Sequence, residues 1–368
     1  MGVAALAVLA TTPTSWAQPG WVRQPTPNRG HLGDDLAGVA ALSPTDIWAV
    51  GSFALDTGNS HTLVEHSDGT TWTRVKSPNP HTASSQLVGA AADSPDDVWA
   101  VGFSDLGDGR HTRTLIEHED GTGWVQVPSA NPDKRSDILE AVAALSPTDL
   151  WAVGGARRSA LIEHDDGTGW SAQAVPRIGQ QDRLTGVSAT SSTDVWAVGY
   201  AYMIKHDTLR TIVLHNDGTG WTISPTEGGS NARFFGVDAL SATNVWAVGA
   251  YTPGPPGSRI DTLVEHFDGT SWSVVPSPNA NGGTVFQAIG GTSPSDLWAV
   301  GYSFNGPTTY TLVEHWNGAG WSIQASPSHG ANNELLGVAA PATTSVVAVG
   351  YRADTIASAQ RTLALHCC

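Results

Sequence analysis

Short apolar runs separated by turn-forming residues recur along the whole chain with a fixed spacing. The sequence WAVG begins at six positions and a variant, VAVG, begins at a seventh: Trp48, Trp99, Trp151, Trp196, Trp246, Trp298 and Val347. The intervals between them are 51, 52, 45, 50, 52 and 49 residues. A period near 50 residues is typical of chains built from one repeated β-structural unit.

A second motif follows each WAVG in step. It is LVEH or a close variant, and it ends at His66, His118, His164, His215, His266, His315 and His366. Six copies lead into an Asp-Gly or Asn-Gly turn and then a tryptophan, at Trp72, Trp124, Trp170, Trp221, Trp272 and Trp321. Such turns between apolar segments are strong signals for a β-hairpin.

Each period therefore predicts four short strands. In the first period they are LAGVAAL (36–42), DIWAVGS (46–52), TLVEH (62–66) and TWTRVKSP (71–78). No segment of helical length has an apolar period of 3.6 residues. Seven repeats of four strands predict an all-β fold, a seven-bladed β-propeller with four-stranded antiparallel blades.

The two ends of the chain carry complementary parts of one repeat. The last repeat ends at His366 without its Trp strand, and an isolated copy, GWVRQPTPN, places Trp21 at 51 residues before Trp72. We predict that a strand at 20–26 completes the last blade, which leaves no open blade. The predicted propeller spans 18–366, with blades at about 35–78, 86–130, 138–176, 184–226, 234–278, 286–327 and 335–366.

Residues that recur in every blade are predicted to be structural, because one active site cannot occur seven times around a ring. This applies to the thirteen repeat tryptophans, Trp21 included, and to the seven repeat histidines. Each histidine needs hydrogen-bond partners, and an Asp or Asn precedes the second strand in six blades: Asp46, Asp97, Asp149, Asp194, Asn244 and Asp296. Small residues let the inner strands converge: Gly38, Gly89, Ala141, Gly186, Gly236, Ala288 and Gly337.

Composition and charge narrow the list of partners. The chain has 368 residues and a formal net charge of −16, with Lys and Arg scattered along the sequence. Nucleic acid and anionic membrane surfaces are therefore poor partners. We expect a monomer without a cofactor.

The first 17 residues resemble a secretory signal peptide. The apolar run VAALAVLA (3–10) precedes small residues at Ser15 and Ala17, which fit a cut before Gln18, although no basic segment precedes the run. The run is too short to span a bilayer. We expect a secreted, extracellular protein, and residues 1–17 are excluded from the fold.

Cysteine is nearly absent. The two copies, Cys367 and Cys368, end the sequence. Neighbouring cysteines can form a vicinal disulfide, but we interpret the pair as an incidental feature of the C-terminus.

The WAVG and LVEH–DGT–W units resemble the repeats of secreted actinobacterial propeller proteins, and they are similar to the kelch and galactose-oxidase central-domain class of propellers. The resemblance covers residues 21–366. It implies a fold rather than an activity. Oxidase chemistry does not carry over, because no segment matches a copper site built from Tyr, His and a Tyr–Cys crosslink.

Function is expected where the repeats differ. Turns joining the first and second strands, and the third and fourth, are nearly uniform and share one face of the disc, the uniform face. The other connections vary in length and chemistry and form the opposite, variable face. Candidate ligand-binding residues at the channel mouth on this face are Asp34, Asp35, Asp137, Glu140, Arg183, Arg233, Gln287 and Glu334, with Thr185 beside them.

Six histidines outside the repeat positions also fall in these variable connections: His31, His61, His81, His111, His206 and His329. A metal site made from some of them is conceivable, but nothing in the sequence fixes their distances. We expect solvated loop histidines and no metal.

Two functions remain open. The first is an exported binding module that presents the variable face to a glycan, a cell-wall component or an extracellular protein. The alternative is an extracellular carbohydrate-active enzyme, a polysaccharide lyase or glycoside hydrolase, with its site at the channel mouth. Uniform blades favour binding, whereas the asymmetry of the loops keeps the enzyme open.

Overall fold

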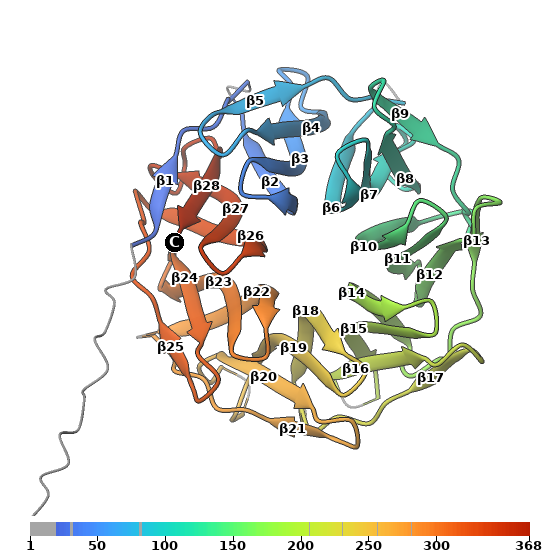
Figure 1. Cartoon of the computed structure of the whole chain (residues 1–368), viewed down its shortest axis with the longest axis vertical. Coiled ribbons are helices and arrows are strands. Elements are labelled where there is room, and N and C mark those ends of the chain that lie inside the picture. Colours follow the sequence, from blue (N-terminus) through green and yellow to red (C-terminus); the bar gives the residue numbers. More distant parts are fainter. Residues whose placement is uncertain are drawn as a thin grey trace, which may run out of the picture.

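The chain forms a ring of seven four-stranded antiparallel sheets around an open axis (Figure 1). The computed structural model describes residues 20–29, 32–80, 83–205, 207–229, 231–255, 257–280 and 282–368. The predicted seven-bladed propeller is confirmed. The signal-like segment 1–17 lies outside the described residues, and none of those described forms a helix long and apolar enough to cross a membrane.

Each blade runs from an inner strand at the axis to a short outer strand at the rim. The inner strands are β2 (Asp34–Ser43), β6 (Ser85–Ser94), β10 (Asp137–Ser146), β14 (Gln181–Ser191), β18 (Ala232–Ser241), β22 (Gly283–Ser293) and β26 (Asn332–Ala342). The second strands are β3 (Asp46–Ala54), β7 (Asp97–Asp105), β11 (Asp149–Ala156), β15 (Asp194–Met203), β19 (Asn244–Tyr251), β23 (Asp296–Asn305) and β27 (Ser345–Ala353).

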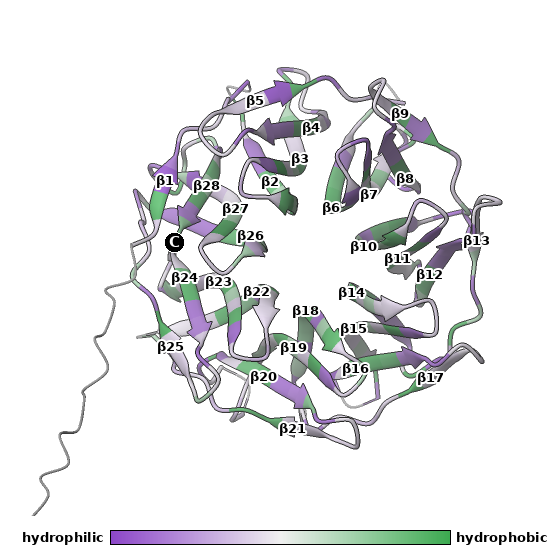
Figure 2. Cartoon of the chain, in the orientation of Figure 1, coloured by the Kyte–Doolittle hydropathy of each residue, from purple (hydrophilic) through white to green (hydrophobic). Residues whose placement is uncertain are grey.

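The third strands are β4 (Ser60–Ser67), β8 (Thr112–Glu119), β12 (Ser159–Asp165), β16 (Thr208–Asn216), β20 (Asp261–Phe267), β24 (Thr308–Trp316) and β28 (Arg361–Cys367). The outer strands are β5 (Trp72–Val75), β9 (Trp124–Val127), β13 (Trp170–Ala172), β17 (Trp221–Ile223), β21 (Trp272–Val274), β25 (Trp321–Ile323) and β1 (Val22–Gln24). We number the blades 1 to 7 in this order. Figure 2 shows hydrophilic residues on outer strands such as β5 and β9, at the rim.

Strand β1 closes the ring as predicted. It pairs antiparallel with β28, and Val22 lies opposite His366. Gln24 also reaches the first blade: the indole N–H of Trp72 donates to its Oε1 at 2.8 Å, and its amide donates to the carbonyl of Gly69 at 3.3 Å. One short strand therefore joins the last blade to the first.

Tryptophan pairs hold neighbouring blades together. The Trp of one second strand packs edge-on against the outer-strand Trp of the next blade, with ring centroids 5.4 to 6.0 Å apart and planes inclined by 64° to 77°. All thirteen repeat tryptophans are buried. At the seventh interface Trp72 packs in a cluster with Val347, the residue that replaces Trp in VAVG. Aromatic pairs of this geometry add to the area that they bury.

A β-bulge in every inner strand turns one side chain toward the axis. In blade 3 it falls on Glu140, between Leu139 and Ala141. At this point the backbone of the second strand lies very close to the backbone of the inner strand. A Cβ on Gly154 of WAVG would lie 2.1 Å from the carbonyl oxygen of Ile138. The glycine of WAVG is thus the partner of the bulge, which aims a side chain into the channel.

The repeat histidines have the hydrogen bonds that the sequence analysis expected. In five blades Nε2 lies 2.6 to 2.9 Å from Oδ1 of the Asp that begins the second strand of the same blade. His266 bonds Asn244 at 2.8 Å, and His366 bonds Ser345 at 3.1 Å. In blades 1 to 6 the imidazole also packs against the WAVG Trp, for example His164 on Trp151 with centroids 3.8 Å apart.

We expect His164→Ala to lower the free energy of unfolding by about 1–2 kcal/mol, because Asp149 loses its partner and Trp151 loses its covering ring. Ligand binding should be unchanged, since the pair lies at the uniform face. Thermal unfolding and binding assays on the same preparation check this. An unchanged melting temperature together with lost binding would show that the histidine belongs to the site instead.

The glutamate of LVEH is a buried feature that the sequence analysis did not single out. Five blades have it: Glu65, Glu117, Glu163, Glu265 and Glu314 are all 0% exposed. Burial raises the pKa of each, to between about 7 and about 9. Blades 4 and 7 have Leu214 and Leu365 at the same position. The strand thus accepts either a protonated carboxyl or an aliphatic side chain there.

The cysteine pair differs from our interpretation. The sulfur atoms of Cys367 and Cys368 are bonded to each other. Cys367 is 3% exposed and packs in the cluster that contains Trp21 and Trp298. The pair is therefore part of the last blade, because β28 continues one residue beyond His366.

Candidate functional site

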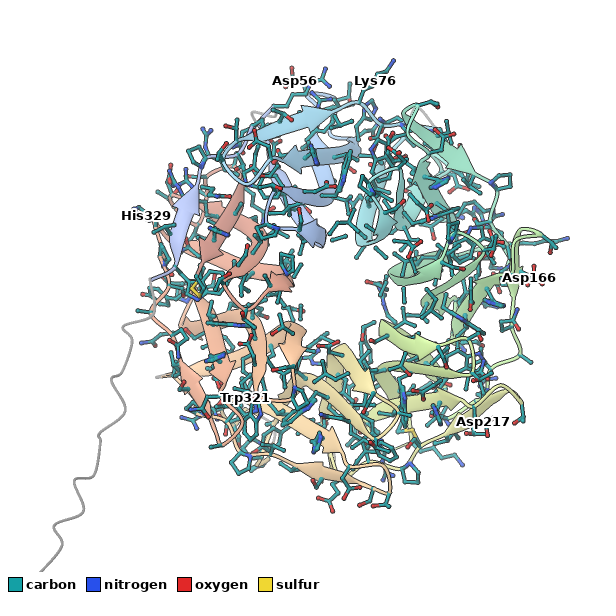
Figure 3. The ribbon with its side chains drawn as sticks, viewed as in Figure 1. Asp56, Lys76, Asp166, Asp217, Trp321 and His329 are labelled. Carbon is teal, nitrogen blue, oxygen red and sulfur yellow. A yellow bond between two sulfur atoms is a disulfide. The ribbon has the colours of Figure 1, made fainter. Side chains whose placement is uncertain are left out.

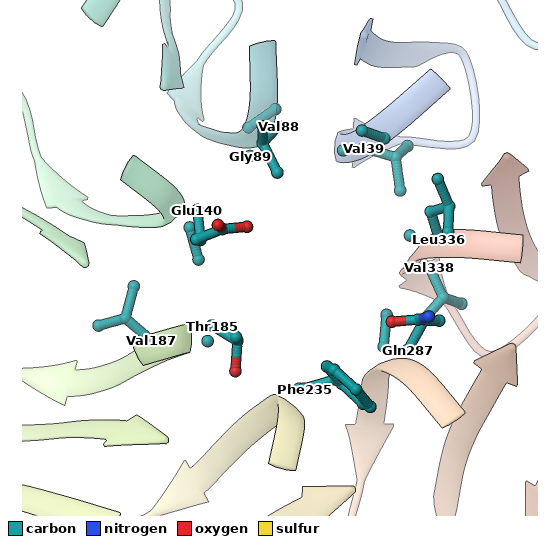
Figure 4. A pocket seen from close by; sticks show the side chains of 18 of the residues that line it. Val39, Val88, Gly89, Glu140, Thr185, Val187, Phe235, Gln287, Leu336 and Val338 are labelled. Atoms are coloured by element: carbon teal, nitrogen blue, oxygen red, sulfur yellow. The ribbon is translucent and has the colours of Figure 1, made fainter. Parts of the chain in front are cut away.

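The bulged residues of the seven inner strands line the axial channel (Figure 4). They are Ala37, Val88, Glu140, Thr185, Phe235, Gln287 and Leu336, and with Arg183 and Tyr200 they surround a cavity of about 370 Å³. Five of the nine carry polar groups suited to hydrogen bonding: Glu140, Arg183, Thr185, Tyr200 and Gln287. Convergent polar groups in a concave site are the usual signature of a ligand pocket.

A groove lies beside this cavity, between blades 3 and 4. Its volume is about 180 Å³, and its lining includes Arg157, Gln181 and Tyr202. Arg183 and Tyr200 line both the channel cavity and the groove. The two spaces therefore adjoin at these side chains, and together we call them the mouth groove.

Blade 3 opens this groove because its hairpin is short. Strands β11 and β12 are joined by two residues, Arg157 and Arg158, after seven paired positions, whereas β15 and β16 of blade 4 pair at nine positions. The residue after WAVG is Gly155 in blade 3, where blade 4 has Tyr200. Arg183 Cγ would lie 3.8 Å from a Cβ placed on Gly155. The absence of a side chain at Gly155 and the shortness of the β11–β12 hairpin thus leave space beside Arg183.

Arg183 and Glu140 form an ion pair across the boundary between blades 4 and 3. The Glu140 side chain is 16% exposed and that of Arg183 is 41% exposed. A guanidinium held by one carboxylate still has donors available for a ligand. Together with Gln287 these two predicted residues line one cavity, as the sequence analysis expected.

Three other predicted residues, Asp35, Glu334 and Arg233, do not line this cavity. Ser52 Oγ donates to Asp35 Oδ1 at 2.7 Å, and burial raises the pKa of Asp35 to about 6. Burial also raises the pKa of Glu334, although a hydrogen bond with Tyr351 opposes this shift. The guanidinium of Arg233 lies 5.5 Å from the ring centroid of Phe235 in the channel. These groups come from blades 1, 7 and 5 respectively.

Tyr351 connects the carboxyls of Asp35 and Glu334. Its pKa is raised first by burial, then by the negative charge of Glu334 and, more weakly, by that of Asp35. Tyr302 of blade 6 also has a pKa raised by burial and by Glu334, while Arg233 opposes the shift. Asp35 and Glu334 therefore share one environment at the channel mouth.

Asp34 and Asp137 do not lie in the mouth groove. They are 1% and 0% exposed. Their carboxylates accept backbone N–H groups of the preceding connection, from Arg29 at 2.6 Å and from Asp133 at 3.2 Å. Side chains alternate along a strand, so the residue beside an axial one is turned into the blade, where it fixes the connection.

The three candidate metal-binding histidines that the structure describes are not brought together. His31, His81 and His206 lie outside the described residues. His111 pairs with Asp108 in its own hairpin, His61 packs edge-on against Phe53, and Figure 3 places His329 at the rim. Within the described part of the chain no three His, Cys, Asp or Glu side chains gather as a metal site would require.

Sequence reasoning missed several residues of the mouth groove, among them Gly155, Arg157, Tyr200 and Tyr202. A signal for two of them exists, because the position after WAVG is a large aromatic in blades 2, 4, 6 and 7 and glycine in blade 3. That position pairs with the residue two before the bulge of the inner strand, so Tyr200 lies opposite Arg183. Comparing the residue after WAVG across the seven blades would have pointed to blades 3 and 4.

No family model matches the sequence, and no curated protein matches it. Solved structures with a similar fold include YCF48 bound to a D1 peptide, with 14% identity over 97% of this chain and 99% of that chain and a TM-score of 0.58. The WD40 repeats of RRP9 align over 95% and 98% at 12% identity, with a TM-score of 0.57.

A GH74 xyloglucanase from Xanthomonas campestris aligns over 91% of this chain and 53% of its own at 12% identity, with a TM-score of 0.55. At these identities the likeness shows the fold alone. The neighbours thus include proteins with different roles on the same seven-bladed scaffold.

Proposed function

We propose that this protein is a binding module that holds an extended ligand in the mouth groove. The observation that carries the proposal is that the channel cavity and the groove adjoin at Arg183 and Tyr200, which line both. Seven identical blades would have the same depression at every blade boundary. Only the boundary between blades 3 and 4 has a short hairpin beside a glycine after WAVG. Function on a repeat scaffold is expected at such a departure from symmetry.

The proposed partner is a glycan, a cell-wall component or an extracellular protein, bound by a monomer outside the cell. The signal-like residues 1–17 and the resemblance to secreted actinobacterial propellers support an extracellular location. Proteins of this fold include one solved with a bound peptide and one xyloglucanase, so both ligand classes are compatible with it.

Gly155→Tyr tests the site. The tyrosine restores the residue found after WAVG in blades 4, 6 and 7, and a Cβ meets nothing closer than 3.8 Å there, so the fold should be kept. We expect at least a tenfold loss of binding on a glycan and extracellular-protein array, because the side chain fills the groove. Gly320→Tyr, which adds the same ring in an open turn of the uniform face, is the matched control.

Two results would contradict the site. One is binding by Gly155→Tyr that equals the wild type, and the other is an equal loss in Gly320→Tyr. Melting temperatures of both variants must match the wild type for the comparison to count, and the geometry predicts that they do.

A second candidate function rests on Asp35 and Glu334. Two carboxyls with raised pKa values beside Tyr351 resemble the acid–base pair of a polysaccharide-degrading enzyme. This enzyme would release reducing ends from a polysaccharide, and Asp35→Asn would abolish the release. The hydrogen bond from Ser52 to Asp35 gives that carboxyl a structural role as well, so we place binding first.

A further inference from the structure

Positively charged residues gather around the mouth groove although the chain is strongly acidic. The connections and strand ends that border it are residues 133–140, 155–159, 176–183 and 200–208. They contain seven Lys or Arg against five Asp or Glu, whereas the rest of the chain contains eleven against twenty-nine. Residues that are scattered along the sequence therefore meet on one part of the variable face.

Backbone contacts show that these segments are neighbours. The N–H of Arg157 donates to the carbonyl of Ser136 at 2.7 Å, and the N–H of Asp182 donates to the carbonyl of Arg158 at 3.2 Å. The N–H of Ile204 donates to Oε1 of Gln180 at 2.9 Å. The connection before β10, the hairpin of blade 3, the start of β14 and the hairpin of blade 4 thus form one continuous rim.

Most of these cations have no carboxylate partner among the described residues. Arg183 is paired with Glu140, but the ion pairs of the described part of the chain include none of the other six: Lys134, Arg135, Arg157, Arg158, Arg177 and Lys205. All six are exposed. Two of the five nearby acids, Asp137 and Asp182, are buried and accept backbone N–H groups instead.

We infer that the ligand of the mouth groove is an anionic polysaccharide, whose carboxylates or phosphates contact Arg157, Arg158 and Arg183; this rests on the proposed function of the groove. Like charges that are placed together without partners repel one another, and an anionic ligand would relieve that repulsion. Guanidinium groups match carboxylate and phosphate in planar, two-point hydrogen bonds. The acidic remainder of the surface would direct such a ligand to this place.

The lining favours a sugar chain over an acidic peptide. Peptides bind by adding to a free sheet edge or by filling apolar pockets. Strands β11 and β15 beside the groove are paired on both sides, and only the axial edges of the inner strands β10 and β14 are unpaired. The part of the mouth groove between blades 3 and 4 offers one aliphatic side chain, Ile138, beside Tyr200, Tyr202 and Gln181. Tyrosine rings with polar neighbours suit the mixed polar and apolar surface of a sugar.

The test compares four probes of similar length on the full chain by isothermal titration calorimetry: oligogalacturonate, a phosphorylated cello-oligosaccharide, a neutral cello-oligosaccharide and poly-glutamate. We expect one or both acidic glycans to bind and the other probes to bind at least tenfold more weakly. The two acidic arms distinguish carboxylate from phosphate. Binding should weaken as salt rises from about 50 to about 200 mM, because the contacts are ionic.

The matched variants are the double substitution Arg157→Asn with Arg158→Asn, and Arg23→Asn on exposed β1. Asparagine tolerates the left-handed backbone of Arg157, whose φ is 52°. We expect the double variant to bind the acidic glycan at least tenfold more weakly and Arg23→Asn to be unchanged.

Three results would overturn the inference: no acidic glycan binds, a neutral glycan or poly-glutamate binds as tightly, or the double variant binds like the wild type. If the preferred probe is neutral and Gly155→Tyr abolishes its binding, the groove remains the site and only its charge preference is wrong. If Gly155→Tyr leaves all binding unchanged, the proposed function itself is wrong.

Discussion

Glu117→Leu is expected to raise the free energy of unfolding at pH 8 by about 1–3 kcal/mol, the usual cost of a buried polar group without partners. Neither side-chain oxygen of Glu117 has a hydrogen-bond partner among the described residues, and burial raises its pKa to about 9. Leucine already occupies the position in blades 4 and 7, as Leu214 and Leu365. Chemical denaturation of both proteins measures the difference.

The gain should depend on pH, and its sign follows from proton binding. Between about pH 4.5 and about pH 9 the unfolded chain has an ionised Glu117, while the folded chain keeps the proton, so this group makes the wild type less stable as pH rises. The leucine variant lacks that loss. Its advantage should therefore grow as pH rises through this range and be smallest below it.

Glu163→Leu is the matched control. Oε2 of Glu163 accepts the N–H of Ala130 at 3.1 Å, so its removal leaves a backbone donor without that acceptor. The gain at pH 8 should be smaller than for Glu117→Leu. A Glu117→Leu protein that is less stable than the wild type at pH 8, or a gain that is the same at pH 5 and pH 8, would contradict this account of the buried carboxyls.

Trp21→Ala is expected to lower the free energy of unfolding by about 3–5 kcal/mol, the usual cost of a buried Trp-to-Ala change. The ring is 6% exposed, and it packs edge-on against Trp298 with centroids 5.5 Å apart. Its loss also weakens β1, which covers the edge of β28. An uncovered strand edge promotes association between molecules, so the variant should also aggregate sooner on heating.

Val22→Ala is the control on the same strand, because Val22 is 57% exposed and should contribute little. Denaturation curves and light scattering during heating distinguish the two variants. Equal stability of Trp21→Ala and Val22→Ala would mean that the N-terminal strand does not close the ring.

Repetition made the fold predictable from sequence. A single short apolar segment predicts a strand poorly, but seven copies of the same pattern predict it well. The isolated Trp21 supplied the outer strand that the seventh blade lacked. The pairing of five of the repeat histidines with an aspartate followed because both recur at fixed offsets. Positions that recur in every repeat of the sequence occupy equivalent places in every blade, so the fold and the histidine pairs could be inferred without side-chain geometry.

The site was harder to predict because it depends on where the repeats fail. Asp34 and Asp35 are neighbours in sequence, yet one is turned into the blade and the other toward the mouth. Arg157 and Arg183 are separated by most of a blade in sequence and meet because β14 of blade 4 packs against β10 and β11 of blade 3. Gly155 contributes to the site because the absence of a side chain there leaves space for the groove. None of these relations is visible before strand register and hairpin length are known.

The central claim is that the mouth groove between blades 3 and 4 is the working surface of the protein. Hydrogen–deuterium exchange with and without saturating oligogalacturonate tests it most directly. The account predicts slower exchange in residues 153–160 and 180–204, with no change in the Asp-Gly turns of the uniform face. Protection of those turns, or unchanged exchange at 153–160 while the probe is bound, would contradict it.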